Sequence, residues 1–176
     1  GMSVQARDGK NANAALLVSV SPDDFRSYGR GAGDPLCGVS FQRHWEAAAF
    51  RVGGGDWHAP GQTVGSFLKK GRGRHKPVRV NPTYALGVKE ANLRKCLPGF
   101  VSDSLAQALP LLNQKLSGYA NSGAFMTGIE ARSSSPVRIV RDGQTLQATR
   151  LEGLYPCGEG AGYAGGIMSA AIDGIK

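Results

Sequence analysis

The stretch "GEGAGYAGG", residues 158–166, decides how the end of this chain folds. It places five glycines in nine positions, ten residues before the last. Its spacing G-x-G-x-x-G, residues 160–165, occurs in nucleotide-binding units between a strand and a helix, with a second strand and an acidic residue following. Only eleven residues follow Gly165, so the motif cannot open such a unit here. The glycines either complete a ligand site built elsewhere or pack a helix tightly against a strand.

The residues around this stretch predict a strand, a turn and a helix. "GLYPC", residues 153–157, is typical of a short buried strand, and we expect the final helix to begin near Gly162. Bare N–H groups in the first turn of a helix favour an anion or an electron-rich oxygen. Glu159 would follow the strand, where its carboxylate can accept hydrogen bonds from sugar or ribityl hydroxyls.

The last segment, "GIMSAAIDGIK", carries apolar or small residues on every face of a helix except at Asp173 and Lys176. A helix that is apolar all round needs neighbours on all sides. We therefore expect the sequence to be part of a longer protein. Gly1 and Met2 are typical of the remnant of an expression tag. We therefore expect residues 1–13 to consist of this remnant and a segment that leads into the first domain.

Composition indicates a globular chain whose many glycines suit tight turns and a close approach of the backbone to a ligand. The 176 residues suit one domain or a domain with a subdomain, and 26 of them are glycine. The net charge of +8 comes mostly from "KKGRGRHKPVR", residues 69–79. That cluster is typical of a solvated loop. It could also bind a polyanion, although it lacks the interleaved aromatic residues that nucleic-acid binding favours.

The cysteines and histidines predict no metal site. Cys37, Cys96 and Cys157 lie about sixty residues apart without a C-x-x-C pair, so we expect reduced thiols and a cytoplasmic protein. The histidines lack metal-ligand spacing, and no G-x-S-x-G motif indicates a serine hydrolase. No apolar run is long enough to predict a membrane span. We assign no catalytic residue.

The order of the predicted elements indicates an α+β fold. The helices expected are residues 39–50, a shorter one that starts with "APGQTVGSFL" and has Pro60 in its first turn, and 101–116 with a break or kink at Pro110. The strands expected are residues 14–20, 124–131, 136–140 and 153–157, with a hairpin turn and a strand in "GQTLQAT", residues 143–149, and a short strand or a turn in "NPTYALGV", residues 81–88. This order is not a regular series of βαβ units.

"EARSSSPVR", residues 130–138, is a second candidate site. It holds Arg132, Ser134, Ser135 and Arg138 in a segment interrupted by a proline. Guanidinium and hydroxyl groups that converge there could bind a carboxylate or a phosphate of a substrate. The same pattern is also typical of an ordinary strand–turn–strand with two surface arginines.

The segment "GLYPCGEGAGYAGGIMSAAIDGI" closely resembles the closing segment of bacterial FAD-dependent dehydrogenases and oxidoreductases of the NAD-utilising flavoprotein type. The resemblance extends through "NANAALLVSV", "APGQTV", "PTYALGV" and "TGIEARSSSPVRIVRD", and so over nearly the whole chain. In these flavoproteins the chain leaves the FAD domain, builds an inserted domain and returns with a strand, a turn and a helix aimed at the flavin. The glycines at 158–166 would then close a cofactor site that an earlier segment begins.

The resemblance divides the chain into an inserted, substrate-side domain at 14–125 and a returning segment of a Rossmann-like FAD domain at 126–176. It implies that Gly158 and Glu159 lie on the ribityl side of the flavin, and it implies cofactor contacts from a further set of residues. These are Gly160, Ala161, Gly162, Tyr163, Gly165, Gly166 and Ile167.

The resemblance predicts the C-terminal part of an FAD-dependent oxidoreductase that takes a small-molecule substrate, with NAD(P)H as a possible electron donor. The family's own phosphate-binding motif after its first strand is absent here. We therefore expect the chain alone to bind FAD weakly or not at all, and to need an N-terminal FAD-binding segment of the same protein as its partner. The alternatives are a nucleic-acid-binding module that uses residues 69–79, which we favour less, and a structural domain without a ligand.

Overall fold

The computed structural model describes residues 5–69 and 80–176, and it divides into two compact units. One unit comprises the residues up to Ser19 together with His44–Ile129, and the other comprises Val20–Arg43 together with Glu130–Lys176. Helices and one small sheet make an α+β fold, as the sequence predicts. Among the described residues, no helix combines the length and the apolar composition needed to cross a membrane.

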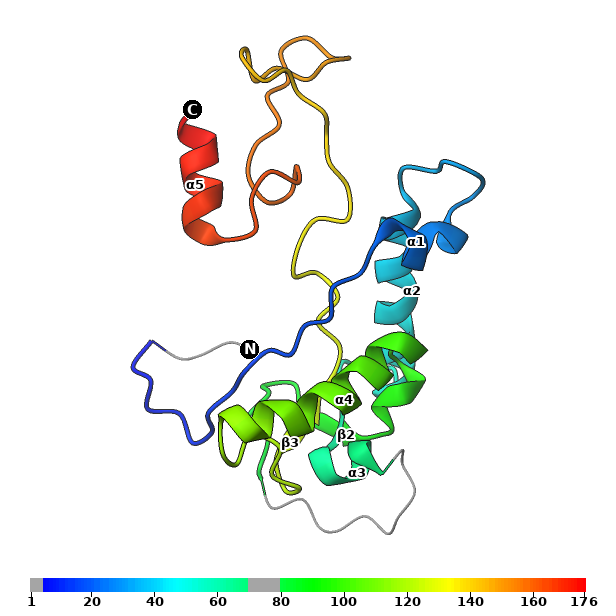
Figure 1. Cartoon of the computed structure of the whole chain (residues 1–176), viewed down its shortest axis with the longest axis vertical. Helices are drawn as coiled ribbons and strands as arrows, with labels where there is room; N and C mark the ends of the chain where they lie inside the picture. Colours follow the sequence, from blue (N-terminus) through cyan, green and yellow to red (C-terminus); the bar gives the residue numbers. More distant parts are fainter. Residues whose placement is uncertain (1–4, 70–79) are drawn as a thin grey trace. The chain divides into compact units, whose positions relative to one another are not determined.

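The first unit is built around a three-stranded sheet with the order β2-β1-β3. Strand β1 pairs in parallel with β2 and antiparallel with β3. Figure 1 shows α4 and α3 close to this sheet. The unit contains part of α2 (Cys37–Val52), then β1 (Ala59–Thr63), α3 (Val64–Leu68), β2 (Val88–Glu90), the 3-10 helix η2 (Leu93–Lys95), α4 (Gly99–Lys115) and β3 (Phe125–Thr127).

The helices expected at 39–50 and 101–116 are confirmed as α2 and α4. Helix α4 turns Leu105 and Leu109 into the core, and the side chain of Phe67 on α3 is fully buried in the same cluster. Helix α4 continues through Pro110 instead of splitting there. Helix α2 contributes Ala48 and Ala49 to this core.

The helix expected to begin at residue 59 is wrong in its first half. The segment 59–63 is the central strand β1 and not the first turn of a helix, because it pairs on both sides. Gly61 permits the antiparallel pairing, since a Cβ at this position would collide with the ring of Phe125. The helix that follows is shorter than expected and begins only after Thr63, whose hydroxyl accepts a hydrogen bond from Ser66 N at 3.2 Å.

The segment 14–20 is extended, but it is not a strand of any sheet among the described residues. Leu16 and Val18 pack against the core, whereas Leu17 is 60% exposed. The apolar run predicts a buried strand, but only Leu16 and Val18 are partly buried, and among the described residues no strand pairs with this segment.

The second unit contains little regular structure. Its elements are α1 (Pro22–Phe25), the 3-10 helix η1 (Arg26–Tyr28), the first turns of α2, and α5 (Ile167–Ile175). Phe41 on α2 packs against the rings of Phe25 and Tyr28, with centroids 6.1 and 5.0 Å away. Of the strands expected at 124–131, 136–140 and 153–157, the first is present as β3 in the first unit, and the other two are not strands, because within the described residues no neighbouring strand pairs with them. An isolated bridge pairs Arg141 with Ala148, outside all three expected strands.

Candidate functional site

The glycine turn, residues 156–166, is held by its own backbone. Gly162 N donates to Glu159 O at 2.9 Å, and Tyr163 N donates to Gly158 O at 3.0 Å. Gly158 and Gly162 have φ angles of +70° and +82°, a region that favours glycine. A Cβ on Gly162 would lie 2.5 Å from Val137 O, whereas a Cβ on Gly160 would meet nothing within 4 Å. Two glycines therefore shape the turn, and the surface at Gly160 is open.

Helix α5 begins at Ile167, later than the predicted start near Gly162, because residues 158–163 form the turn. Gly166 is its N-cap, and Ala170 N donates to Gly166 O at 2.8 Å. Ala170 faces Gly158, where a Cβ would lie 3.6 Å from the Ala170 methyl carbon. The helix thus packs against the glycine turn, as the sequence suggests, but without the strand expected at 153–157.

A buried ion pair fixes α5 to this turn. Arg141 Nη2 lies 2.6 Å from Asp173 Oδ1, and the two side chains are 8% and 7% exposed. Asp173 Oδ2 also accepts a hydrogen bond from Gly158 N at 2.9 Å, and Arg141 Nη1 donates to Pro156 O at 2.6 Å. The bonds from Arg141 and Gly158 lower the pKa of Asp173 to about 2, and the bond to Asp173 raises the pKa of Arg141.

Tyr163 ties the turn to the segment 138–141. Its hydroxyl donates to Ile139 O at 3.1 Å and accepts from Arg141 N at 3.0 Å. The Arg141 guanidinium carbon lies 3.8 Å from the centre of the Tyr163 ring, a cation–π contact. Arg138 lies over the same ring at 5.0 Å and donates from Nε to Gly162 O at 3.0 Å. Tyr163 of the turn thus binds the segment 138–141, and Arg138 of that segment binds the turn.

The predicted substrate residues fall into two groups. Arg132, Ser134 and Ser135 line a cavity of about 370 Å³ together with Glu159 and Gly160 of the glycine turn, whereas Arg138 does not line it. The Ser135 hydroxyl donates to Val137 O at 2.8 Å and lies 3.2 Å from Gly160 O. Ser135 therefore joins the two predicted sites through a contact with Gly160, 25 residues later in the sequence.

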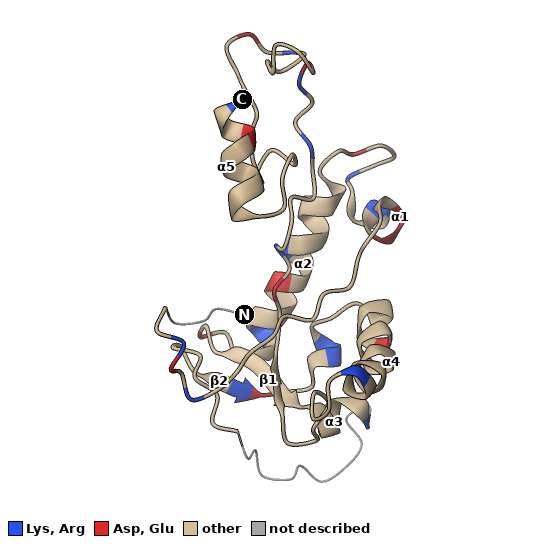
Figure 2. Ribbon diagram, turned by 60° about the vertical axis from the view of Figure 1, so that its left-hand side comes forward, with Lys and Arg blue, Asp and Glu red and all other residues tan. Residues whose placement is uncertain are grey.

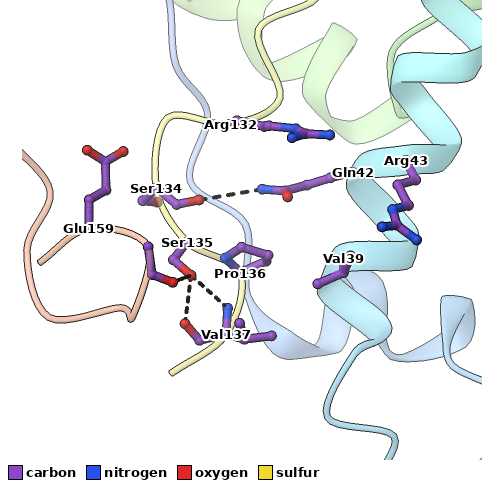
Figure 3. Close-up of a pocket in the computed structure, with 10 residues that line it drawn as sticks. Val39, Gln42, Arg43, Arg132, Ser134, Ser135, Pro136, Val137 and Glu159 are labelled. Carbon is purple, nitrogen blue, oxygen red and sulfur yellow. Dashed lines mark hydrogen bonds between the residues drawn. The ribbon is translucent and has the colours of Figure 1, made fainter. Parts of the chain in front are cut away.

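Helix α2 supplies cavity residues that sequence reasoning missed. Val39, Gln42 and Arg43 line the cavity from α2, opposite the segment 132–137 (Figure 3). Gln42 Nε2 donates to Ala131 O at 2.9 Å. No motif marks these residues, since helical spacing alone does not say what a helix packs against.

The remaining predicted features lie elsewhere. Residues 70–79 of the basic cluster, including Lys70, Arg72 and Arg74, are outside the described residues. His58 Nδ1 lies 2.7 Å from Asp56 Oδ1, two residues earlier in the chain. Within residues 5–69 and 80–176, no three histidine, cysteine or acidic side chains gather so as to hold a metal ion.

Two comparisons place the chain among known proteins. Residues 1–133 match the family described as FAD-dependent protein, C-terminal domain-like. An uncharacterized protein of Clostridium beijerinckii is 48% identical over 176 residues, which is 100% of this chain and 32% of that protein. The chain thus spans about a third of the length of this relative. Because the family match covers more than half of its residues, the chain belongs to the FAD-dependent protein, C-terminal domain-like family.

Proposed function

We propose that this chain is the C-terminal part of an FAD-dependent oxidoreductase, and that its glycine turn contacts the flavin. The family supports a part in an FAD-dependent protein. The observation that carries the rest is the open backbone at Gly160, beside the exposed side chain of Glu159, in a turn that a buried hydrogen bond joins to helix α5. Because Gly160 has no side chain, a planar cofactor can approach the main-chain N–H groups there closely.

The chemistry of such a protein would come from the flavin, which accepts or donates a hydride when it is bound. The residues of this chain would bind and orient. Glu159 would accept hydrogen bonds from ribityl hydroxyls, and the segment 158–167 would cover one side of the ring system. The electron donor NAD(P)H stays a prediction from the resemblance.

The test uses a longer protein that contains this chain together with the preceding segment of the same polypeptide. We expect it to be yellow as purified, with flavin absorbance near one equivalent. Gly160→Leu should reduce bound flavin at least tenfold, because the new side chain fills the space in front of the turn. Gly143→Leu is the matched control, since a Cβ there also meets nothing within 4 Å and the residue lies outside the glycine turn.

Three outcomes would contradict the proposal: a colourless longer protein that FAD does not reconstitute, equal flavin content in both variants, or a flavin that no substrate or nicotinamide donor reduces. The 176-residue chain by itself should bind FAD at least a hundredfold more weakly than the longer protein. Fluorescence quenching of added FAD measures this difference.

A further inference from the structure

We infer that the cavity between α2 and the segment 132–137 binds the oxyanion of a small organic substrate, a carboxylate or a phosphate, and that Arg43 and Arg132 recognise it. Arg43 is assigned this role from the structure alone. The inference deepens the proposed function by naming the class of substrate. It rests on that function in one respect, which is that the bound oxyanion is assigned to the substrate.

The walls of the cavity are held at a fixed separation. Gly38 allows α2 to approach closely, since a Cβ there would lie 2.9 Å from the Pro136 Cβ. One turn later, Gln42 Nε2 donates to Ala131 O at 2.9 Å. Arg43 and Arg132 each directly follow one partner of this hydrogen bond, and both line the cavity. The bond therefore keeps the two guanidinium-bearing residues on one small site.

The lining has the chemistry of an oxyanion site with an apolar part. Two guanidinium groups in one cavity can bind a carboxylate or phosphate through paired, charge-assisted hydrogen bonds. Among the described residues, no carboxylate lies within ion-pairing distance of Arg43, so none of them neutralises its charge. Val39, Pro136 and Val137 supply apolar surface for a short carbon chain (Figure 3).

Glu159 sets the direction of the bound molecule. Its carboxylate lines the same cavity, and Figure 3 shows it on the other side of the segment 132–137 from the two guanidinium groups. An anion is repelled by this carboxylate and attracted by the arginines, so the oxyanion lies on the α2 side. The rest of the molecule extends towards Gly160, at the turn proposed to contact the flavin.

The test titrates the 176-residue chain with propionate and with ethyl phosphate, followed through the arginine Nε–Hε resonances in NMR spectra. We expect the Arg43 and Arg132 signals to move together and to saturate. Arg43→Gln should weaken binding about tenfold, the size typical of one lost charge-assisted contact. Arg43→Lys should recover only part of that affinity, because a lysine cannot form the bidentate pair. Arg51→Gln is the matched control, an exposed arginine two turns further along α2 that does not line the cavity.

The proposal is overturned if Arg43→Gln and Arg51→Gln bind the anions equally, or if propylamine binds as tightly as propionate. Arg43 is exposed, so its variants should fold. Arg132→Gln should also weaken binding of the anions, which tests the same site independently. These titrations contain no flavin, so they fail or succeed separately from the proposed function. In the longer protein, an Arg43→Gln variant that loses flavin as fully as Gly160→Leu would assign the oxyanion to the cofactor's phosphate, and would also overturn the proposal.

Discussion

Asp173 on α5 and Arg141 form a two-point ion pair, with Nη2–Oδ1 at 2.6 Å and Nη1–Oδ2 at 2.9 Å, although 32 residues separate them. The same carboxylate accepts the Gly158 N–H, so one side chain links the last helix, the glycine turn and the segment that carries the arginine. Asp173 is the one charged residue of α5, which is otherwise tan in Figure 2. Breaking this pair should therefore loosen the proposed cofactor turn.

The ion pair predicts a pH dependence of stability. The Asp173 pKa is lowered from 3.8 to about 2, so the stabilisation is complete above pH 4–5 and is lost as pH falls through 2. Asp173→Asn should lower the Tm by several degrees at pH 7 and should flatten the fall of Tm between pH 5 and 2. Near-UV circular dichroism of the tyrosines measures both effects.

Asp23→Asn is the control for that experiment, because Asp23 pairs with Arg26 at 2.7 Å but its side chain is 82% exposed. A pair this exposed contributes little to stability. An equal effect of both substitutions would mean that the Asp173 pair does not stabilise the glycine turn.

Two substitutions separate the hydrogen bonds of the Tyr163 hydroxyl from the cation–π contacts of its ring. Tyr163→Phe loses the hydrogen bonds to Ile139 O and from Arg141 N and should cost ~1 kcal/mol of unfolding free energy. Tyr163→Ala also loses the ring beneath the two arginines and should cost more. Hydrogen exchange at Ile139 N, which donates to Ala161 O, reports the local opening. Equal exchange rates in wild type and Tyr163→Ala would contradict this role.

The glycines of the turn differ in what they tolerate. Gly162→Ala should destabilise the second unit by more than ~1 kcal/mol, because φ is +82° and the new methyl group would press on Val137 O. Gly160→Ala should change stability by less than ~1 kcal/mol, since its Cβ lies in open space. Chemical denaturation followed by circular dichroism compares them. A reversed order of the two effects would show that the turn is held differently.

The core of the first unit rests on α4. Leu109 is 1% exposed, and Leu109→Ala should cost about 2–5 kcal/mol through lost burial and a cavity. Leu111 on the same helix is 59% exposed, and Leu111→Ala should change stability by less than ~0.5 kcal/mol. Trp45 packs against this core, so its fluorescence follows unfolding in urea. Similar midpoints for both variants would contradict the assignment of the core face.

The cysteines should differ in reactivity. Cys96 is fully buried, and burial raises its thiol pKa to about 11, so very little thiolate forms at pH 8. Cys157 is exposed. Iodoacetamide should label Cys157 within minutes and Cys96 only after unfolding, as measured by mass spectrometry of tryptic peptides. Labelling of Cys96 in the native protein at the rate of Cys157 would contradict its burial.

Local sequence patterns predicted the elements whose residues interact with close neighbours in the chain. Helix α2 and helix α4 follow from apolar spacing, because in a helix every backbone bond forms within four residues. The glycine turn is also a local feature, since positive φ angles at Gly158 and Gly162 depend on the absence of a side chain.

Sequence patterns did not predict features that depend on distant partners. Residues 14–20 and 153–157 have the composition of strands, but a strand exists only where another strand pairs with it, and no described segment does so. Residues 59–63 lack strand composition, yet they form the central strand because β2 and β3 flank them.

The sequence by itself determined that the chain ends in a glycine-rich turn followed by an apolar helix, because backbone freedom and helical spacing are properties of neighbouring residues. Only the tertiary structure decided which side chains surround that turn. Arg141 meets Asp173 across 32 residues, and Gln42 meets Ala131 across 89. Contacts over such distances are selected by the packing of the whole unit, and no local pattern in the chain encodes them.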